Sequence, residues 1–218
     1  MPRWGMVIDV KRCIACWGCS IACKEEHFLP PRVFWNRVLI GERGKFPSSS
    51  KLILPILCNH CSDAACVEAC PTGATYVRAD GIVAIDDKKC VGCRACLVAC
   101  PYQQRTYYDK EVKDREYFPG QGKTALELIG EKLYPFKLGT VIKCNFCTER
   151  LEAGMKKGLT PGVDEDASPA CVNICPVNAR IFGDLSDPNS KINRLIMEHK
   201  GKQLRPEFGT DPAVYYID

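Results

Sequence analysis

Two stretches of the chain share one spacing of four cysteines, C-x2-C-x2-C-x3-C. The first lies in "VIDVKRCIACWGCSIAC" (7–23), and each of its cysteines recurs 77 positions later in "VAIDDKKCVGCRACLVAC" (83–100). Two further groups open with "CNHC" and "CNFC", so the sixteen cysteines fall into four groups of four with none left over. In chain order, groups one to four are Cys13, Cys16, Cys19 and Cys23; Cys58, Cys61, Cys66 and Cys70; Cys90, Cys93, Cys96 and Cys100; and Cys144, Cys147, Cys171 and Cys175.

Composition narrows what these thiols can do. The formal net charge of the 218 residues is only +4, and no basic patch indicates binding to nucleic acid. The longest apolar run, "LILPIL" (52–57), is too short to span a membrane, and the first residues lack the apolar segment of a signal peptide. We therefore expect a reducing compartment, unless a partner's signal exports the chain. Thiols there bind metals rather than form disulfides.

Zinc and iron–sulfur clusters are the two candidate metal groups. Structural zinc sites use two C-x2-C pairs separated by a spacer, and only group four resembles that pattern. Groups one and three instead have the bacterial ferredoxin run, in which three thiolates hold one cluster and the fourth binds another. Pro71, Pro101 and Pro176 follow the last cysteines of groups two to four, whereas Lys24 follows group one. We predict a changed turn at Lys24 and unchanged ligation.

Groups two and four are also related. The segment "CNHC…ACVEACPTGATYV" (58–77) matches "CNFC…ACVNICPVNARIF" (144–182), so the order A–B–A′–B′ indicates an internal duplication. Groups two and three have the order of a two-cluster ferredoxin, and exchange of their fourth ligands leaves groups one and four to pair across the chain. The predicted ligand sets, quartets 1 to 4, are Cys13, Cys16, Cys19 and Cys175; Cys70, Cys90, Cys93 and Cys96; Cys58, Cys61, Cys66 and Cys100; and Cys23, Cys144, Cys147 and Cys171.

The predicted fold class is α+β. It consists of two bacterial dicluster ferredoxin-like modules related by internal duplication, with short hairpins and helices plus an inserted segment. The outer module comprises residues 1–57 and 144–185 and would hold quartets 1 and 4. The central module, 58–102, would hold quartets 2 and 3. Residues 103–143 form the insert, and residues 186–218 form a C-terminal helix and an extended tail.

The whole chain resembles the four-cluster iron–sulfur subunits of the dimethyl sulfoxide reductase family of molybdopterin oxidoreductases. The resemblance is carried by "MVIDVKRCIAC", "LCNHCSDAACVEACPTGA", "GIVAIDDKKCVGCRACLVACPY", "PACVNICPVNARIFGDLSDPNS" and "LRPEFGTDPAVYYID". It implies four [4Fe–4S] clusters with cross-paired ligands, which agrees with the repeat. The spacer 148–170 and "PYQQRTYY" are similar, more narrowly, to iron–sulfur subunits of phenylacetyl-CoA:acceptor oxidoreductases.

The resemblance also implies partners. These are a large molybdopterin or tungstopterin catalytic subunit and, often, an integral membrane quinone-reactive subunit, between which this chain would relay electrons. The chain would be peripheral in a membrane-associated complex, on the cytoplasmic side unless a signal-bearing partner exports it. No nucleophile–base pair, phosphate-binding loop or carboxylate pair is present, so we expect no catalytic residue. The alternatives are a free-standing polyferredoxin and a structural zinc protein, which copurification and iron content would distinguish.

Residues beside the cysteines have predicted supporting roles. Asp9 and Asp86 are expected to hydrogen-bond the loops that follow them. His60 and Trp17 are expected to cover clusters, whereas His27 and His199 are interpreted as surface or interface residues. Cations expected near the ligands are Lys11, Lys24, Lys89, Arg94 and Lys143.

The insert has its own predicted features. Apolar periodicity predicts one helix within the insert, at 124–133. It predicts another in the C-terminal segment, at 190–200, with Ser190 as its cap. The insert is rich in aromatic residues, which are enriched at protein interfaces, so we predict that it docks a partner. Its aromatic residues are Tyr107, Tyr108, Tyr117, Phe118, Tyr134 and Phe136.

Overall fold

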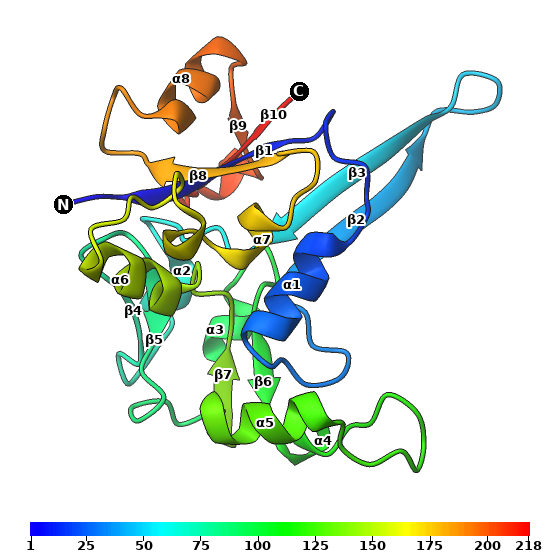
Figure 1. Ribbon diagram of the computed structural model, residues 1–218, viewed down its shortest axis with the longest axis vertical. Helices are drawn as coiled ribbons and strands as arrows, with labels where there is room; N and C mark the ends of the chain where they lie inside the picture. Colours follow the sequence, from blue (N-terminus) through cyan, green and yellow to red (C-terminus); the bar gives the residue numbers. More distant parts are fainter.

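The two ends of the chain meet in one four-stranded sheet, of strand order β8-β1-β10-β9 (Figure 1). The computed structural model describes residues 1–218. Strand β1 (Trp4–Asp9) pairs in parallel with β10 (Val214–Ile217) and antiparallel with β8 (Arg180–Asp184), while β9 (Lys202–Gln203) pairs with β10. Because β1 is buried on both faces, its apolar run "MVI" drives this assembly of distant segments.

Three antiparallel two-stranded sheets complete the β-structure. The longest is a hairpin that projects away from the body of the molecule (Figure 1). The turn "RADG" (78–81) connects the second pair, and the third pair brackets the helices of the insert. The pairs are β2 (Asn36–Arg43) with β3 (Ser50–Leu57), β4 (Thr75–Val77) with β5 (Val83–Ile85), and β6 (Thr106–Tyr108) with β7 (Thr140–Ile142).

Helices are short, and four of them carry cysteines. The α-helices are α1 (Gly18–Glu26), α2 (Ala65–Glu68), α3 (Ala95–Val98), α4 (Lys110–Lys113), α5 (Ala125–Leu133), α6 (Thr148–Lys156), α7 (Ala170–Asn173) and α8 (Lys191–Glu198). Two 3₁₀ turns are η1 (Glu165–Ala167) and η2 (Pro206–Phe208). None of the helices has the length and apolar character that crossing a membrane requires.

The residue after each last cysteine decides how far these helices run. Helices α2, α3 and α7 each have four residues and end before a Cys-Pro pair, because proline cannot donate the next helical hydrogen bond. Helix α1 has nine residues and continues through Lys24 to Glu26. The predicted change of turn at Lys24 is therefore confirmed. Its ammonium group donates to the carbonyls of Leu29, Pro30 and Val33 and so fixes the loop that follows.

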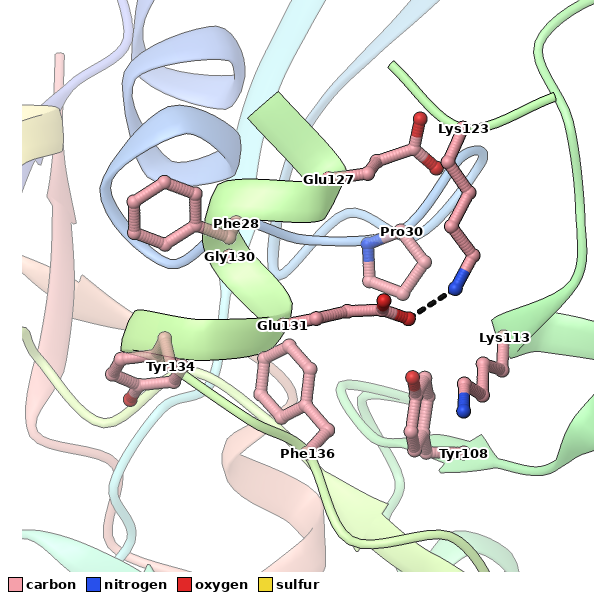
Figure 2. A pocket seen from close by; sticks show the side chains of 10 residues that line it. All are labelled: Phe28, Pro30, Tyr108, Lys113, Lys123, Glu127, Gly130, Glu131, Tyr134 and Phe136. Carbon is pink, nitrogen blue, oxygen red and sulfur yellow. Dashed lines mark hydrogen bonds and ion pairs between the residues drawn. The ribbon is translucent and has the colours of Figure 1, made fainter. Parts of the chain in front are cut away.

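The insert packs on that loop (Figure 2). Helix α5 begins with a capping box between Thr124 and Glu127, and Gly130 lets the helix approach Phe28, because a Cβ there would lie 2.3 Å from the Phe28 Cβ. Lys123 and Glu131 form the ion pair that Figure 2 draws. The predicted helix therefore exists, but its apolar residues Leu126, Ile129 and Leu133 are exposed rather than packed inward.

The predicted C-terminal helix and the predicted hydrogen bonds of Asp9 and Asp86 are present. Helix α8 forms as expected, with the Ser190 hydroxyl accepting from the Asn193 N–H. The Asp9 and Asp86 carboxylates accept from loop N–H groups, at 3.0 Å from Arg12 and 2.9 Å from Lys88. Small sheets and short helices thus make up a mixed fold of the expected class.

Candidate metal centres

The four C-x2-C loops share one backbone feature. In each loop the residue before the second cysteine has a positive φ, from 44° at His60 to 70° at Gly92, with 57° at Ala15 and 56° at Phe146. Residues other than glycine adopt this left-handed conformation rarely, so its recurrence at one position of all four loops is not accidental. It curls each loop, and the two thiols of the loop can then face the same side.

Three of the four thiols of quartet 1 come from the start of the chain and the fourth comes from near its end. Cys13, Cys16, Cys19 and Cys175 line one cavity, whose wall includes Trp17. Burial raises the pKa of the Cys13 thiol, and the nearby Cys19 and Cys175 thiols add to the shift. The structure therefore brings together all four residues that the repeat assigns to this quartet.

Quartet 2 also surrounds a cavity. Cys70, Cys90, Cys93 and Cys96 line a small space between the loops of groups two and three. Burial raises the pKa of Cys96, which has Cys70 and Cys90 as neighbours. Cys93 is exposed, like Cys16 of quartet 1, so each of these two quartets reaches the surface.

Quartet 4 lies deepest, because all four of its thiols are buried. Burial raises the pKa of Cys23, and the next largest contributions come from Cys144, Cys171 and Cys147. Neighbouring thiolates repel one another in a buried space of low dielectric, and this repulsion favours protonated thiols. Four thiolates therefore need a cationic group between them.

Quartet 3 has the same crowding. Burial raises the pKa of Cys61 to about 12, and Cys58, Cys66 and Cys100 are its thiol neighbours. The two interior quartets adjoin each other, since Cys58 contributes to the raised pKa of Cys144. Each predicted quartet is thus a set of thiols held near one another.

Hydrogen-bond donors point at several of the sulfur atoms. The Thr75 N–H donates to Cys70 Sγ at 3.4 Å, and the Ala179 N–H donates to Cys175 Sγ at 3.2 Å. Burial would raise the pKa of Cys70, but this N–H and the Thr72 hydroxyl lower it to about 7. Donors to sulfur stabilise thiolate, and crowded thiolates with such donors are the environment that a [4Fe–4S] cluster requires. The residues present therefore fit that group.

His60 is buried between two quartets, which agrees with the covering role expected of it. Its Nδ1 accepts from the Val83 N–H at 3.2 Å, and its ring lies 3.8 Å from the ring of Phe146. Burial lowers the pKa of His60 well below its usual value, so the ring is neutral. Trp17 begins helix α1 in the left-handed conformation and lines the quartet 1 cavity.

The expectation for His27 was wrong. Its side chain is buried, with Nε2 3.3 Å from Cys147 Sγ and the ring between Trp35 and Tyr134. Helix α1 runs past Lys24 to Glu26, and His27 follows directly as its C-cap residue. His199 is exposed, as expected.

The sequence analysis did not identify two candidate functional residues, Arg105 and Arg180. Both are buried; Arg105 donates to Cys66 Sγ at 2.8 Å, and Arg180 lines the cavity of quartet 1. The available signal was that each arginine stands five residues after a Cys-Pro cysteine, Cys100 or Cys175. Among the expected cations, Lys143 is buried beside Cys144 and donates to its carbonyl at 2.7 Å.

Comparison with known proteins agrees with this geometry. Residues 50–116 match a family model described as a 4Fe-4S dicluster domain. The chain is 41% identical over its whole length to a putative dimethyl sulfoxide reductase iron-sulfur subunit of Halobacterium salinarum, covering 80% of that protein. It is 37% identical to the arsenate respiratory reductase iron-sulfur subunit ArrB of a Shewanella species, over 99% of this chain and 96% of that one.

The chain belongs to the iron–sulfur subunits of the dimethyl sulfoxide reductase family. A third relative, a subunit of the tetrathionate reductase of Salmonella typhimurium, is 36% identical over 99% of this chain and 72% of its own length. The expected cofactor class, [4Fe–4S], and the expected role as an electron-transfer subunit are confirmed by this membership. The narrower resemblance to phenylacetyl-CoA:acceptor oxidoreductases stays a prediction.

Proposed function

We propose that the chain holds four [4Fe–4S] clusters, one in each of quartets 1 to 4, and relays single electrons through them. The observation that carries this proposal is the lining of the quartet 1 cavity, where Cys175 joins three cysteines more than 150 residues away in the sequence. A ferredoxin segment whose ligands all lie in one stretch of the chain would not need Cys175. Bound clusters supply one-electron chemistry, and the chain supplies thiolates, N–H donors and cover from water.

The arrangement favours clusters over structural zinc. A zinc site draws four ligands to one ion at short distances. Here no three His, Cys, Asp or Glu side chains are placed to hold a single metal ion, and the thiols of quartets 1 and 2 instead line the walls of two cavities. Thiols around a space rather than around a point suit a cubane of iron and sulfide.

An internal duplication accounts for the repeated geometry. Ile8 pairs with Arg180 in the β1·β8 ladder, and the equivalent residues Ile85 and Thr75 pair in the β5·β4 ladder. The next hydrogen bond also recurs, at 2.8 Å from the Asp9 N–H to the Ala179 carbonyl and from Asp86 to Ala74. Equal register beside equivalent cysteines supports two ferredoxin-like modules, with the outer one built from 1–57 and 144–185.

The contacts between quartets suggest the order of the relay. Quartets 1 and 4 meet where Cys19 neighbours Cys171, and quartets 4 and 3 meet where Cys144 neighbours Cys58. Quartets 3 and 2 meet at Arg105, which donates to Cys66 Sγ and whose charge opposes the burial that raises the pKa of Cys96. The proposed order is therefore quartet 1, 4, 3, 2. The two end quartets are those with an exposed thiol, as a relay with a donor and an acceptor requires.

The partners follow from the family. We infer a large molybdopterin or tungstopterin catalytic subunit at one end and an integral membrane quinone-reactive subunit at the other. The relatives include one chain of a polysulfide reductase and the iron-sulfur cluster-binding subunit of a menaquinone reductase. The chain would be a peripheral member of such a complex. A free-standing polyferredoxin is the alternative, and isolation of the native complex would separate the two.

The insert 103–143 remains the proposed docking segment, although only some of its aromatic residues are exposed. Tyr108, Tyr134 and Phe136 pack within the chain, whereas Phe118 is 71% exposed. Phe118, in the loop before α5, and Leu133, at the end of α5, are the exposed apolar side chains proposed to contact a partner. Phe118→Glu combined with Leu133→Glu should keep the iron content and release the catalytic subunit. Phe46→Glu at the hairpin tip is a control, and continued stoichiometric copurification of the double variant would refute the docking role.

Cluster content is tested by anaerobic iron and acid-labile sulfide analysis of the purified complex, corrected for metal in the partner. Four cubanes predict about sixteen irons and sixteen sulfides per chain. Stoichiometric zinc, or iron for only two clusters, would contradict the proposed function.

A further inference from the structure

Two buried arginines lie beside the cysteine quartets. Arg105 is 9% exposed and lies at the start of the insert, five residues after Cys100, and Arg180 is 3% exposed and lies five residues after Cys175. Arginine side chains are rarely buried unless their charge is compensated. Neither of these forms an ion pair with a carboxylate, although eight such pairs occur in the chain. Their compensating charge must come from elsewhere.

Arg105 lies between quartets 3 and 2. Its Nη2 donates to Cys66 Sγ of quartet 3 at 2.8 Å, and its positive charge opposes the burial that raises the pKa of Cys96 of quartet 2. A second bond, from Nη1 to Thr75 Oγ1 at 3.3 Å, fixes the plane of the guanidinium. One side chain therefore lies near ligands of both clusters in the central module.

Arg180 has a similar place in the outer module. It lines the quartet 1 cavity together with Cys13, Cys16 and Cys19, and its charge opposes the burial that raises the pKa of Cys171 of quartet 4. Its Nη1 donates to Met6 Sδ at 3.6 Å and its Nη2 to Asn36 Oδ1 at 2.7 Å, and these bonds hold the side chain in place. A planar guanidinium held in this way can face two clusters at once, which a lysine ammonium matches less well.

We propose that Arg105 and Arg180 are paired tuning residues, each of which places one permanent positive charge between the two clusters of its module and raises both reduction potentials together. The proposal rests on the ligand sets given under the proposed function. Reduction adds a negative charge to a cluster, and a nearby cation with N–H donors to the ligand sulfurs stabilises that charge. No bond forms or breaks as one electron passes, and the guanidinium keeps its protons throughout.

The charge of these residues is also independent of pH. A guanidinium cannot be deprotonated under the conditions in which proteins stay folded. The two clusters of a module therefore receive a constant shift in the same direction, which keeps them close in potential and favours transfer between them.

The test is an EPR-monitored redox titration of the intact complex carrying Arg180→Gln or Arg105→Gln. We expect Arg180→Gln to lower the equilibrium constant for reduction at least tenfold, or 59 mV for one electron, at both outer clusters. Arg105→Gln should act equally on the two central clusters, and the lysine variants should recover part of each loss. Arg78→Gln is the matched control, because Arg78 bonds only the carboxylates of Asp80 and Glu152. Unchanged potentials, or an equal shift of all four clusters, would overturn the proposal.

A second measurement needs no substitution. Pulsed EPR of the reduced complex grown with guanidino-¹⁵N-arginine should show a nitrogen coupling on two clusters per module. Absence of that coupling, with all four cluster signals present, contradicts the arginine proposal and leaves the relay intact. Fewer than four signals would instead contradict the proposed function.

Discussion

The outer and central modules use the same cysteine spacing in different surroundings. In the outer module five of the eight cysteines are buried, and in the central module three are. The outer module is covered by the four-stranded sheet and, through the extended α1, by the loop that Lys24 fixes. The central module has only the three-residue strands β4 and β5 and two four-residue helices. Ligand spacing therefore sets where thiols converge, whereas segments distant in sequence set how far water is excluded.

The largest expected difference in stability between the modules is at the residue after the last cysteine of groups one and three, which is Lys24 in the outer module and Pro101 in the central module. Lys24→Pro should break α1 in its interior and remove a buried ammonium that serves three carbonyls. A proline inside a helix costs about 3 kcal/mol or more. Pro101→Lys in the central module follows a helix that has already ended and should cost less than about 1 kcal/mol. Thermal unfolding of the two variants measures the contrast, and equal losses would contradict it.

A second contrast lies at equivalent positions of the C-x2-C loops. Position 15 is alanine and position 92 is glycine, and both have positive φ. In Gly92→Ala the new Cβ would lie 2.2 Å from the Gly139 carbonyl oxygen, a backbone atom that cannot turn aside. We expect a loss of about 1–3 kcal/mol in unfolding free energy for Gly92→Ala, from overpacking.

The matched control is Ala15→Gly. It relieves a left-handed alanine and adds freedom to the unfolded chain, so it should change stability by less than about 1 kcal/mol. Chemical denaturation of both variants decides the point. A tolerated Gly92→Ala would mean that the loop of quartet 2 can shift away from β7.

These contrasts show what the sequence could and could not predict. The cysteine loops, the ends of three helices at proline and the hydrogen bonds of Asp9 are local, and spacing predicts them. The burial of His27 and the inward placement of Arg180 depend on segments more than 100 residues away. The exposed apolar face of α5 was missed because periodicity identifies a stripe without saying what it contacts.

The smallest expected effect concerns a hydroxyl that only the central module has. Thr72 Oγ1 lies 3.8 Å from Cys70 Sγ, and the equivalent residue of the outer module is Val177. Thr72→Val should lower the potential of the quartet 2 cluster by less than a tenfold change in equilibrium constant, because a weak donor to sulfur is lost. EPR-monitored titration checks this, and a rise in potential would be the opposite result.

Cross-ligation of the outer module is the central claim, and cysteine variants of the intact complex test it most directly. Cys16→Ser and Cys175→Ser should perturb the same EPR signal, because both residues line one cavity. The double variant should perturb no further cluster. Cys171→Ser should instead alter a different signal, the one that Cys23→Ser also alters. If Cys175→Ser and Cys171→Ser changed the same cluster and spared that of Cys16, the exchange of ligands between the two ends of the chain would be wrong.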